Sequence, residues 1–144
     1  MDDPAGPPPR KLLLVEDDFY IRDIYKVEAK DRGYVVYEAA DGSDALNMAK
    51  IARPDIILLD IMLPKINGLD VLKTLKSWPE FKDTPVIIVS NVGDSQVHQK
   101  ALQAGAADYL TKFNNTPQKI MECLQKYEHP VVVSAPGNPP PKVA

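Results

Sequence analysis

Residues 54–60 read Pro-Asp-Ile-Ile-Leu-Leu-Asp, a run of four aliphatic side chains that ends at the carboxylate of Asp60. Since the run has no polar alternation, it predicts a strand buried on both faces, as in parallel sheets covered by helices. Pro54 opens the run, where a missing backbone N–H is tolerated. Asp60 is therefore expected at the carboxyl end of a central strand, where open α/β sheets bind their ligands. Taken alone, Asp60 is equally well explained as a cap of the following loop.

The composition is that of an ordinary globular protein. The chain has 144 residues, of which 44% are hydrophobic and 26% charged, and its formal net charge is −3. This weak negative charge favours neither nucleic acid nor an anionic membrane as a partner. Cys123 is the single cysteine, which excludes an internal disulfide and is typical of a reducing, cytoplasmic location. No run approaches the roughly 20 apolar residues of a membrane span.

Proline marks the two ends of the chain. Nine of its 14 prolines fall within the first ten or the last fifteen residues, and neither end has the apolar density needed to offset the entropy of ordering. We expect a disordered lead-in at residues 1–10, a folded domain at 11–129 and a disordered proline-rich tail at 130–144. A polyproline ligand for a partner protein is the alternative function of such a tail.

Between these ends, apolar runs alternate with segments of helical spacing. The predicted strands are 11–15, 34–39, 54–60, 85–90 and 107–111. The predicted helices are 19–32, 44–52, 68–78, 94–104 and 117–127. This alternation predicts an α/β protein with a five-stranded parallel sheet and helices on both faces, because each crossover is right-handed.

The first and the last predicted helix each show an apolar stripe at helical spacing. In the first helix the stripe consists of Tyr20, Ile24 and Val27. In the last helix it consists of Ile120, Met121, Leu124 and Tyr127. Both stripes are expected to pack on the sheet.

Polar side chains stand where the predicted strands end. They are Glu16 and Asp17 after the first strand, Asp60 at the third, Ser90 at the fourth and Lys112 after the fifth. Because the carboxyl ends of parallel strands share one edge of the sheet, these side chains are expected to converge. Clustered carboxylates repel unless a cation is present, and Mg²⁺ prefers one or two carboxylates with water and a phosphate oxygen. The set therefore suits the binding of a phosphoryl group together with Mg²⁺.

Each residue of this set has a simpler interpretation when it is taken singly. Lys112 could be a solvated surface lysine, Ser90 a turn hydroxyl, and residues 16–18 a charge cluster at a helix N-terminus. Their joint placement at the ends of four strands favours the functional interpretation, since this edge is the usual ligand site of such sheets.

Five motifs, in order, resemble the receiver domain of two-component response regulators. They are residues 13–18, 58–64, 67–68, 89–90 and 105–112. The similarity covers nearly all of residues 11–127 and implies a flavodoxin-like (βα)5 fold with strand order 2-1-3-4-5. It also implies that Asp60 accepts a phosphoryl group from a phosphohistidine on a sensor histidine kinase or a histidine phosphotransfer protein. Such a chain is no enzyme, apart from catalysing its own phosphorylation and dephosphorylation.

The resemblance assigns roles to the acidic residues and the lysine. Asp17, Asp60 and the backbone carbonyl of Met62 would bind Mg²⁺ directly, and Glu16 would bind it through water. Lys112 would pair with the phosphoryl oxygens.

The resemblance also implies a switch made by Ser90 and Tyr109. The Ser90 hydroxyl would swing toward the phosphoryl group, and the Tyr109 ring would move inward behind it. This movement would repack the face made by the fourth helix and the fifth strand, where a partner reads the state. Without the family, Tyr109 is best interpreted as a half-buried aromatic residue of a strand.

One departure from the family concerns the residue after Lys112. Receiver domains usually have a proline there, preceded by a cis bond, whereas this chain has Phe113. A cis bond before a non-proline residue costs about 3 kcal/mol. The bond is therefore either cis under strain, or trans with a different approach of Lys112.

The leading interpretation is a stand-alone phospho-acceptor switch that acts by altered protein binding or by onward phosphotransfer, as a monomer or a phosphorylation-dependent dimer. About fifteen residues follow the last helix, too few for an output domain. Two alternatives are a phosphorylation-independent adaptor and an aspartyl-nucleophile phosphohydrolase, which would need an acid catalyst where Met62 stands. We also expect Met62 and Val92 to shield the phosphoryl site from water, and His98 to be exposed.

Overall fold

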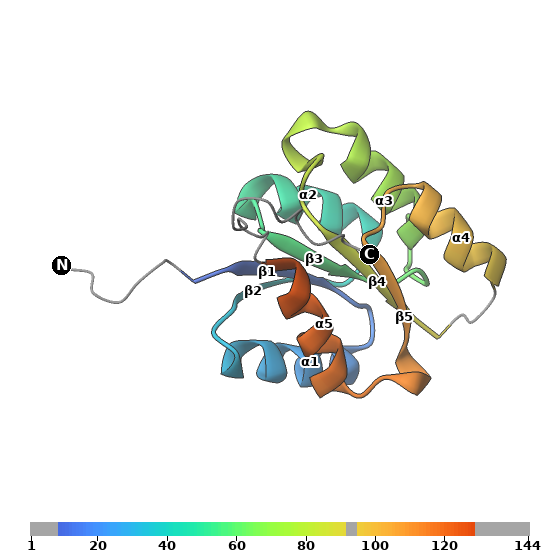
Figure 1. Cartoon of the computed structure of the whole chain (residues 1–144). Coiled ribbons are helices and arrows are strands. Elements are labelled where there is room, and N and C mark those ends of the chain that lie inside the picture. The colour runs from blue at the N-terminus through green and yellow to red at the C-terminus, as the bar shows by residue number, and fades with distance from the viewer. Residues whose placement is uncertain (1–8, 92–94, 129–144) are drawn as a thin grey trace, which may run out of the picture.

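A computed structural model describes residues 9–91 and 95–128 of the chain (Figure 1). Five parallel strands form one sheet with the order β2-β1-β3-β4-β5. The strands are β1 Lys11–Val15, β2 Val35–Ala39, β3 Ile56–Leu59, β4 Val86–Ser90 and β5 Asp108–Thr111. The predicted fold class and strand order are thereby confirmed. The predicted disordered tail, and all but the last two residues of the lead-in, lie outside the described residues.

A helix follows each strand. The helices are α1 Phe19–Asp31, α2 Gly42–Ala52, α3 Gly68–Ser77, α4 Ser95–Gln103 and α5 Pro117–Glu128. Short 3-10 segments occur at η1 Pro79–Phe81 and η2 Lys112–Asn114. Figure 1 shows α1 and α5 on one face of the sheet and α2, α3 and α4 on the other. Within the described ranges, no helix has the length and apolar character needed to cross a membrane.

Alternate residues of each central strand face opposite helical layers. On β1, Leu13 and Val15 pack with the layer of α2, α3 and α4, whereas Leu12 and Leu14 pack with α1 and α5. All four side chains are at most 1% exposed. Because helices cover both faces, the strands need no polar alternation, which explains the uninterrupted apolar runs in the sequence.

The predicted inward face of α1 is wrong. Tyr20 is 77% exposed, Ile24 50% and Val27 51%, so this stripe faces solvent. The helix instead buries Tyr25 and Ala29, which are four residues apart and share one helical face. Both belong to the core cluster on this face of the sheet, where Ala29 is fully buried.

The predicted inward face of α5 is confirmed. Ile120, Met121 and Leu124 are fully buried, and Tyr127 packs against the same cluster while partly exposed. Cys123, on the same helix, is buried and 6% exposed. On this face of the sheet, α5 therefore buries its apolar stripe, whereas α1 exposes its stripe to solvent.

Candidate functional site

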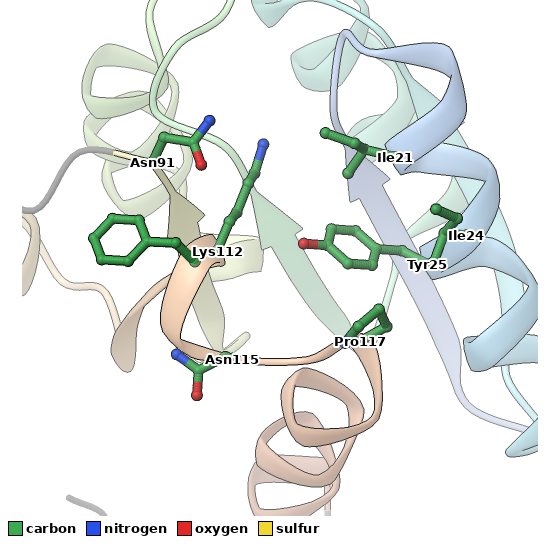
Figure 2. Close-up of a pocket in the computed structure, with 8 residues that line it drawn as sticks. Ile21, Ile24, Tyr25, Asn91, Lys112, Asn115 and Pro117 are labelled. Carbon is green, nitrogen blue, oxygen red and sulfur yellow. The ribbon is translucent and has the colours of Figure 1, made fainter.

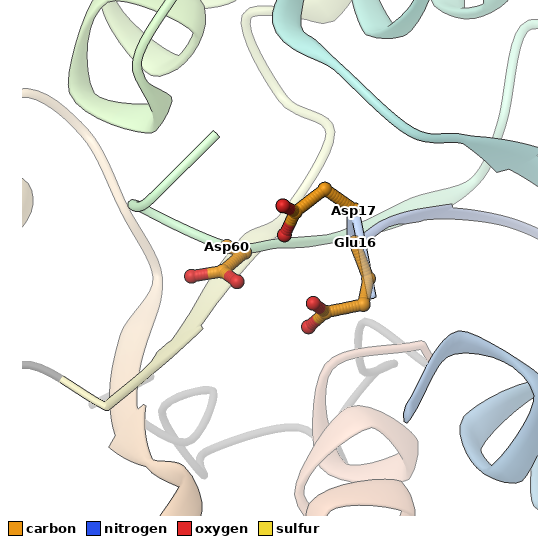
Figure 3. A group of neighbouring side chains, drawn as sticks. All are labelled: Glu16, Asp17 and Asp60. Atoms are coloured by element: carbon orange, nitrogen blue, oxygen red, sulfur yellow. The ribbon is translucent and has the colours of Figure 1, made fainter. Parts of the chain in front are cut away.

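Three carboxylates meet at the carboxyl edge of the sheet. The register pairs Val15 with Leu59, so the residues that follow β1 and β3 begin side by side. Glu16 is 2% and Asp60 4% exposed, while Asp17 is open to solvent. Figure 3 shows the three side chains, and one carboxylate oxygen from each lies within 4.8 Å of those of the other two. Oxygen ligands in such a cluster suit a hard divalent cation such as Mg²⁺.

Asp18 caps a helix, unlike the two acidic residues before it, Glu16 and Asp17. Its Oδ1 atom accepts hydrogen bonds from the backbone N–H groups of Tyr20 at 2.9 Å and Ile21 at 3.0 Å. This is the N-cap arrangement, which satisfies two free donors in the first turn of α1. The simpler interpretation of the acidic run as a helix-end feature therefore applies to Asp18, whereas Glu16 and Asp17 join the carboxylate cluster.

Lys112, directly after β5, contacts the acidic residues. Its Nζ atom donates to Oε1 of Glu16 at 2.6 Å and to Oδ2 of Asp60 at 2.9 Å. Burial alone would lower the pKa of Lys112, but the hydrogen bonds to both carboxylates outweigh burial and raise it. Burial also raises the pKa of Glu16, against the opposing effect of Lys112. The ammonium is thus held charged beside Asp60, and it is not the solvated surface lysine of the simpler interpretation.

The loop after β3 fixes the Asp60 side chain and backbone. The Met62 N–H donates to Oδ1 of Asp60 at 3.1 Å, and the Gly68 N–H donates to the carbonyl of Ile61 at 2.8 Å. A β-carbon on Gly68 would overlap the Asp60 carbonyl oxygen. Gly68 is therefore needed for the close return of the chain, and Asn67 caps the helix that starts there.

Ser90 and Tyr109 lie on neighbouring strands at the same edge. Ser90 ends β4, is fully buried, and pairs in register with Thr111 of β5. Tyr109 lies two residues before Thr111 and is 6% exposed. The ring of His98 stacks on it, with 4.8 Å between centroids and 12° between planes. Tyr109 is thus more deeply buried than the half-buried strand residue of the simpler interpretation, and His98 is exposed as predicted.

The bond between Lys112 and Phe113 is trans, which settles the alternative left open by the sequence. Lys112 still reaches both carboxylates, so a cis bond after it is not required for its position here. Phe113 is 66% exposed. It borders a pocket of about 260 Å³ that also contains Lys112, Tyr25 and Ile24 (Figure 2).

Tyr25 brings a phenol close to the acidic cluster. Figure 2 shows its hydroxyl pointing toward Lys112. Burial raises the pKa of Tyr25 to about 12, so the phenol is neutral at physiological pH. Sequence reasoning missed this residue because it placed the inward face of α1 one position away. The spacing of Tyr25 and the small Ala29 was the signal that could have found it.

A second hollow lies on the other side of the acidic cluster. It has a volume of about 710 Å³, and Asp17, Met62, Leu69 and Val97 are among the residues that line it. Met62 is 62% exposed there. Its side chain borders the approach to the carboxylates, where a shield against water would have to lie. Val92, the other residue expected to shield the site, lies outside the described residues.

Comparisons with known proteins agree on one family. The sequence model of the response regulator receiver domain matches residues 12–125. A probable transcriptional regulator from Cyanophora paradoxa is 31% identical over 132 residues, which cover 90% of this chain and 54% of that protein. The DNA-binding dual master transcriptional regulator RpaA from Synechocystis is 35% identical over 102 residues, covering 71% of this chain and 42% of that protein.

Solved structures give the same result. The chemotaxis response regulator CheY4 of Vibrio cholerae superposes with a TM-score of 0.77 at 30% identity, covering 83% of this chain and 98% of that one. A response regulator structure from Chloroflexus aurantiacus gives a TM-score of 0.78 at 30% identity with the same coverage. The chain spans about half the length of the curated relatives that it matches.

Proposed function

The chain belongs to the response regulator receiver domains of two-component systems, and on this premise we propose that it is a phosphoryl-accepting switch. Asp60 would take the phosphoryl group from a phosphohistidine on a sensor histidine kinase or a histidine phosphotransfer protein. The observation that carries the proposal is the ammonium of Lys112, 2.9 Å from the Asp60 carboxylate and 2.6 Å from Glu16. A fixed positive charge beside a buried carboxylate is what phosphoryl transfer to that carboxylate requires.

In the proposed reaction, an Asp60 oxygen attacks phosphorus in line with the bond to the donor imidazole nitrogen. That P–N bond breaks, its electron pair stays on the imidazole, and the new O–P bond makes an acyl phosphate. Lys112 would leave the carboxylate oxygen for a phosphoryl oxygen and stabilise the charge there. The Met62 N–H holds the other oxygen of Asp60.

The acidic cluster fits a magnesium ion. Asp17 and Asp60 would bind it directly with the Met62 carbonyl, and Glu16 would bind it through water. Bound Mg²⁺ neutralises charge on the transferring group. The 4.8 Å spread of the three carboxylates supports this assignment. Glu16 accepts hydrogen bonds at both carboxylate oxygens, from Lys112 at 2.6 Å and from the Asp18 N–H at 3.1 Å.

The exposed stripe of α1 provides a surface on which the donor protein docks. A donor must bring its imidazole to the edge that holds Asp60, so it contacts the elements bordering this edge. Tyr20 and Ile24 of α1 lie there with Phe113 after β5, each at least 50% exposed. Exposed apolar side chains gathered beside a reactive group mark a protein interface. The proposed occupant is the helical surface of the donor that carries the phosphohistidine.

Phosphorylation would be read out through Ser90 and Tyr109, by altered protein binding or onward transfer, in a monomer or a phosphorylation-dependent dimer. A cytoplasmic location and independence from further domains remain predictions. The predicted lack of a nucleic-acid partner is put in question, because one relative is described as DNA-binding and others as transcriptional regulators. The adaptor and phosphohydrolase alternatives are less well supported, since the acidic residues and lysine are assembled and Met62 offers no acid.

The proposal is tested by incubation with acetyl phosphate and Mg²⁺, followed by intact mass. We expect a gain of one phosphoryl mass that disappears in Asp60→Ala and after chelation of Mg²⁺. Asp83→Ala is the matched control, since Asp83 is an exposed carboxylate on the loop before β4. Lack of any gain in the folded wild type would support the adaptor, and an undiminished gain in Asp60→Ala would contradict the assigned acceptor.

A further inference from the structure

The stack between His98 and Tyr109 joins α4 to the edge of the site. The two rings are nearly parallel, 12° apart, with centroids separated by 4.8 Å. His98 is exposed while Tyr109 is 6% exposed. The imidazole therefore covers one face of the phenol ring and separates it from solvent. Such aromatic pairs stabilise beyond the area that they bury.

α4 buries few apolar side chains against the sheet within Ser95–Gln103. Ala101 is the residue of α4 that is described as buried, and Val97 packs partly against the same core. The other residues of the helix from Ser95 to Gln103 are exposed. Few buried apolar contacts are characteristic of elements with low local stability. The stack of His98 on Tyr109 adds an aromatic contact between α4 and β5 to the packing of these two aliphatic residues.

We propose that His98 is a positioning residue that holds the Tyr109 ring in its buried position and so couples α4 to the switch. This inference rests on the proposed function, because it gives Tyr109 the role of a two-position element. The buried ring is the position that the phosphorylated state requires, behind a Ser90 hydroxyl turned to the phosphoryl group. His98 favours that position before phosphorylation and lowers the cost of the transition.

A histidine suits this task better than an aliphatic residue. Its ring face covers the phenol, while its nitrogen atoms stay in contact with water at the exposed surface of α4. A leucine there would expose apolar surface whenever the Tyr109 ring left. Phenylalanine keeps the ring face and lacks the nitrogens, so it separates the effect of stacking from the effect of hydrogen bonding.

The first test is the proton NMR spectrum of the imidazole groups in the unphosphorylated full chain. The chain has two histidines, and His129 serves as an internal reference. Stacking on Tyr109 places the His98 ring protons over a phenol face, so we expect them upfield of the His129 protons. Tyr109→Leu should remove this shift. Identical chemical shifts of the His98 ring protons in the wild type and in Tyr109→Leu would overturn the stack, whether or not the chain is phosphorylated.

The second test measures the rate of phosphorylation by acetyl phosphate with Mg²⁺. His98→Ala should slow it by roughly 2- to 10-fold, the population shift expected from the loss of one aromatic pair. His98→Phe should keep a rate within about 2-fold of the wild type, and Gln99→Ala, at the next exposed position, should change nothing. An equal rate in His98→Ala and the wild type would overturn the positioning role. If no variant is phosphorylated, the proposed function fails, and the NMR shift still decides the stack.

Discussion

α1 and α5 cover the same face of the sheet, yet they present their apolar stripes in opposite directions. Ile120 and Leu124 of α5 are fully buried, whereas Tyr20 and Ile24 of α1 are 77% and 50% exposed. Both stripes have the spacing of an amphipathic helix. Spacing alone therefore identifies a shared face, and it does not say whether that face meets the core or a partner.

The exposed stripe of α1 lies close to the site, which favours a role in recognition. Ile24 borders the pocket that contains Lys112, and Lys112 bonds to Asp60. The buried stripe of α5 packs instead with Tyr25 and the strand residues beneath it. We infer that α5 stabilises the domain and that the outer face of α1 serves recognition. Four experiments test this division between the two helices.

Leu124→Ala should have the largest effect on stability. Leu124 is fully buried, and removing its side chain leaves a cavity that costs about 2–5 kcal/mol of unfolding free energy. Ile24→Ala is the matched change on α1 and should stay within about 0.5 kcal/mol. Urea unfolding followed by circular dichroism measures both. An equal loss in the two variants would remove the distinction between the helices.

The alkylation rate of Cys123 should show how well the packing of α5 shields its buried face from solvent. Burial, with the nearby Asp108 carboxylate, raises the pKa of Cys123 to about 12. The thiolate is therefore scarce at pH 8, and alkylation by iodoacetamide should be slower than in the urea-unfolded chain by at least about a hundredfold. Mass spectrometry over time gives both rates. Comparable rates in native and unfolded protein would mean that α5 opens readily.

Tyr20→Ala and Ile24→Ala should reduce phosphotransfer from a phosphohistidine protein. Loss of a central interface side chain typically costs more than 1 kcal/mol, so kcat/KM should fall by about 5- to 10-fold. Phosphorylation by acetyl phosphate needs no docked protein and should stay within about 2-fold of the wild type. A parallel loss with both donors would place the effect in the site and contradict a docking role.

The ion pairs of Glu38 should make the smallest contribution to the free energy of unfolding, and this contribution should be lost at low pH. Burial would raise the pKa of Glu38, but hydrogen bonds from Arg22 and Lys26 of α1 outweigh it and lower the pKa. The ionised form therefore contributes stability above the ordinary pKa near 4.5, and this is lost as pH falls through the lowered value. Because Glu38 is partly exposed, the contribution is a few tenths of a kcal/mol.

The variant that checks this pH dependence is Glu38→Gln. Its unfolding free energy, measured between pH 6 and pH 3, should fall less steeply with acid than that of the wild type. Identical slopes would show that the ion pairs between α1 and β2 contribute nothing. α1 would then depend on its two buried residues, Tyr25 and Ala29, for its attachment.

The sequence predicted features that depend on local pattern. The apolar runs at 54–60 and 85–90 marked strands, and residues at strand ends converged because parallel strands share one edge. The inward face of α1 was predicted wrongly, since the stripe of larger apolar residues was preferred to the pair of Tyr25 and the small Ala29. The trans bond before Phe113 is the ordinary form for a non-proline residue, whereas the His98–Tyr109 stack depends on how α4 lies against β5, which no spacing in the chain encodes.

The central claim is that Asp60 is the residue that carries the phosphoryl group. Reduction with borohydride after treatment with acetyl phosphate and Mg²⁺ marks an acyl phosphate, because the activated carboxyl group becomes an alcohol while free carboxylates do not react. Peptide mass mapping then locates the change. We predict homoserine in place of Asp60 and unmodified carboxylates at Glu16 and Asp17. Reduction at any other carboxylate, with Asp60 intact, would contradict the account.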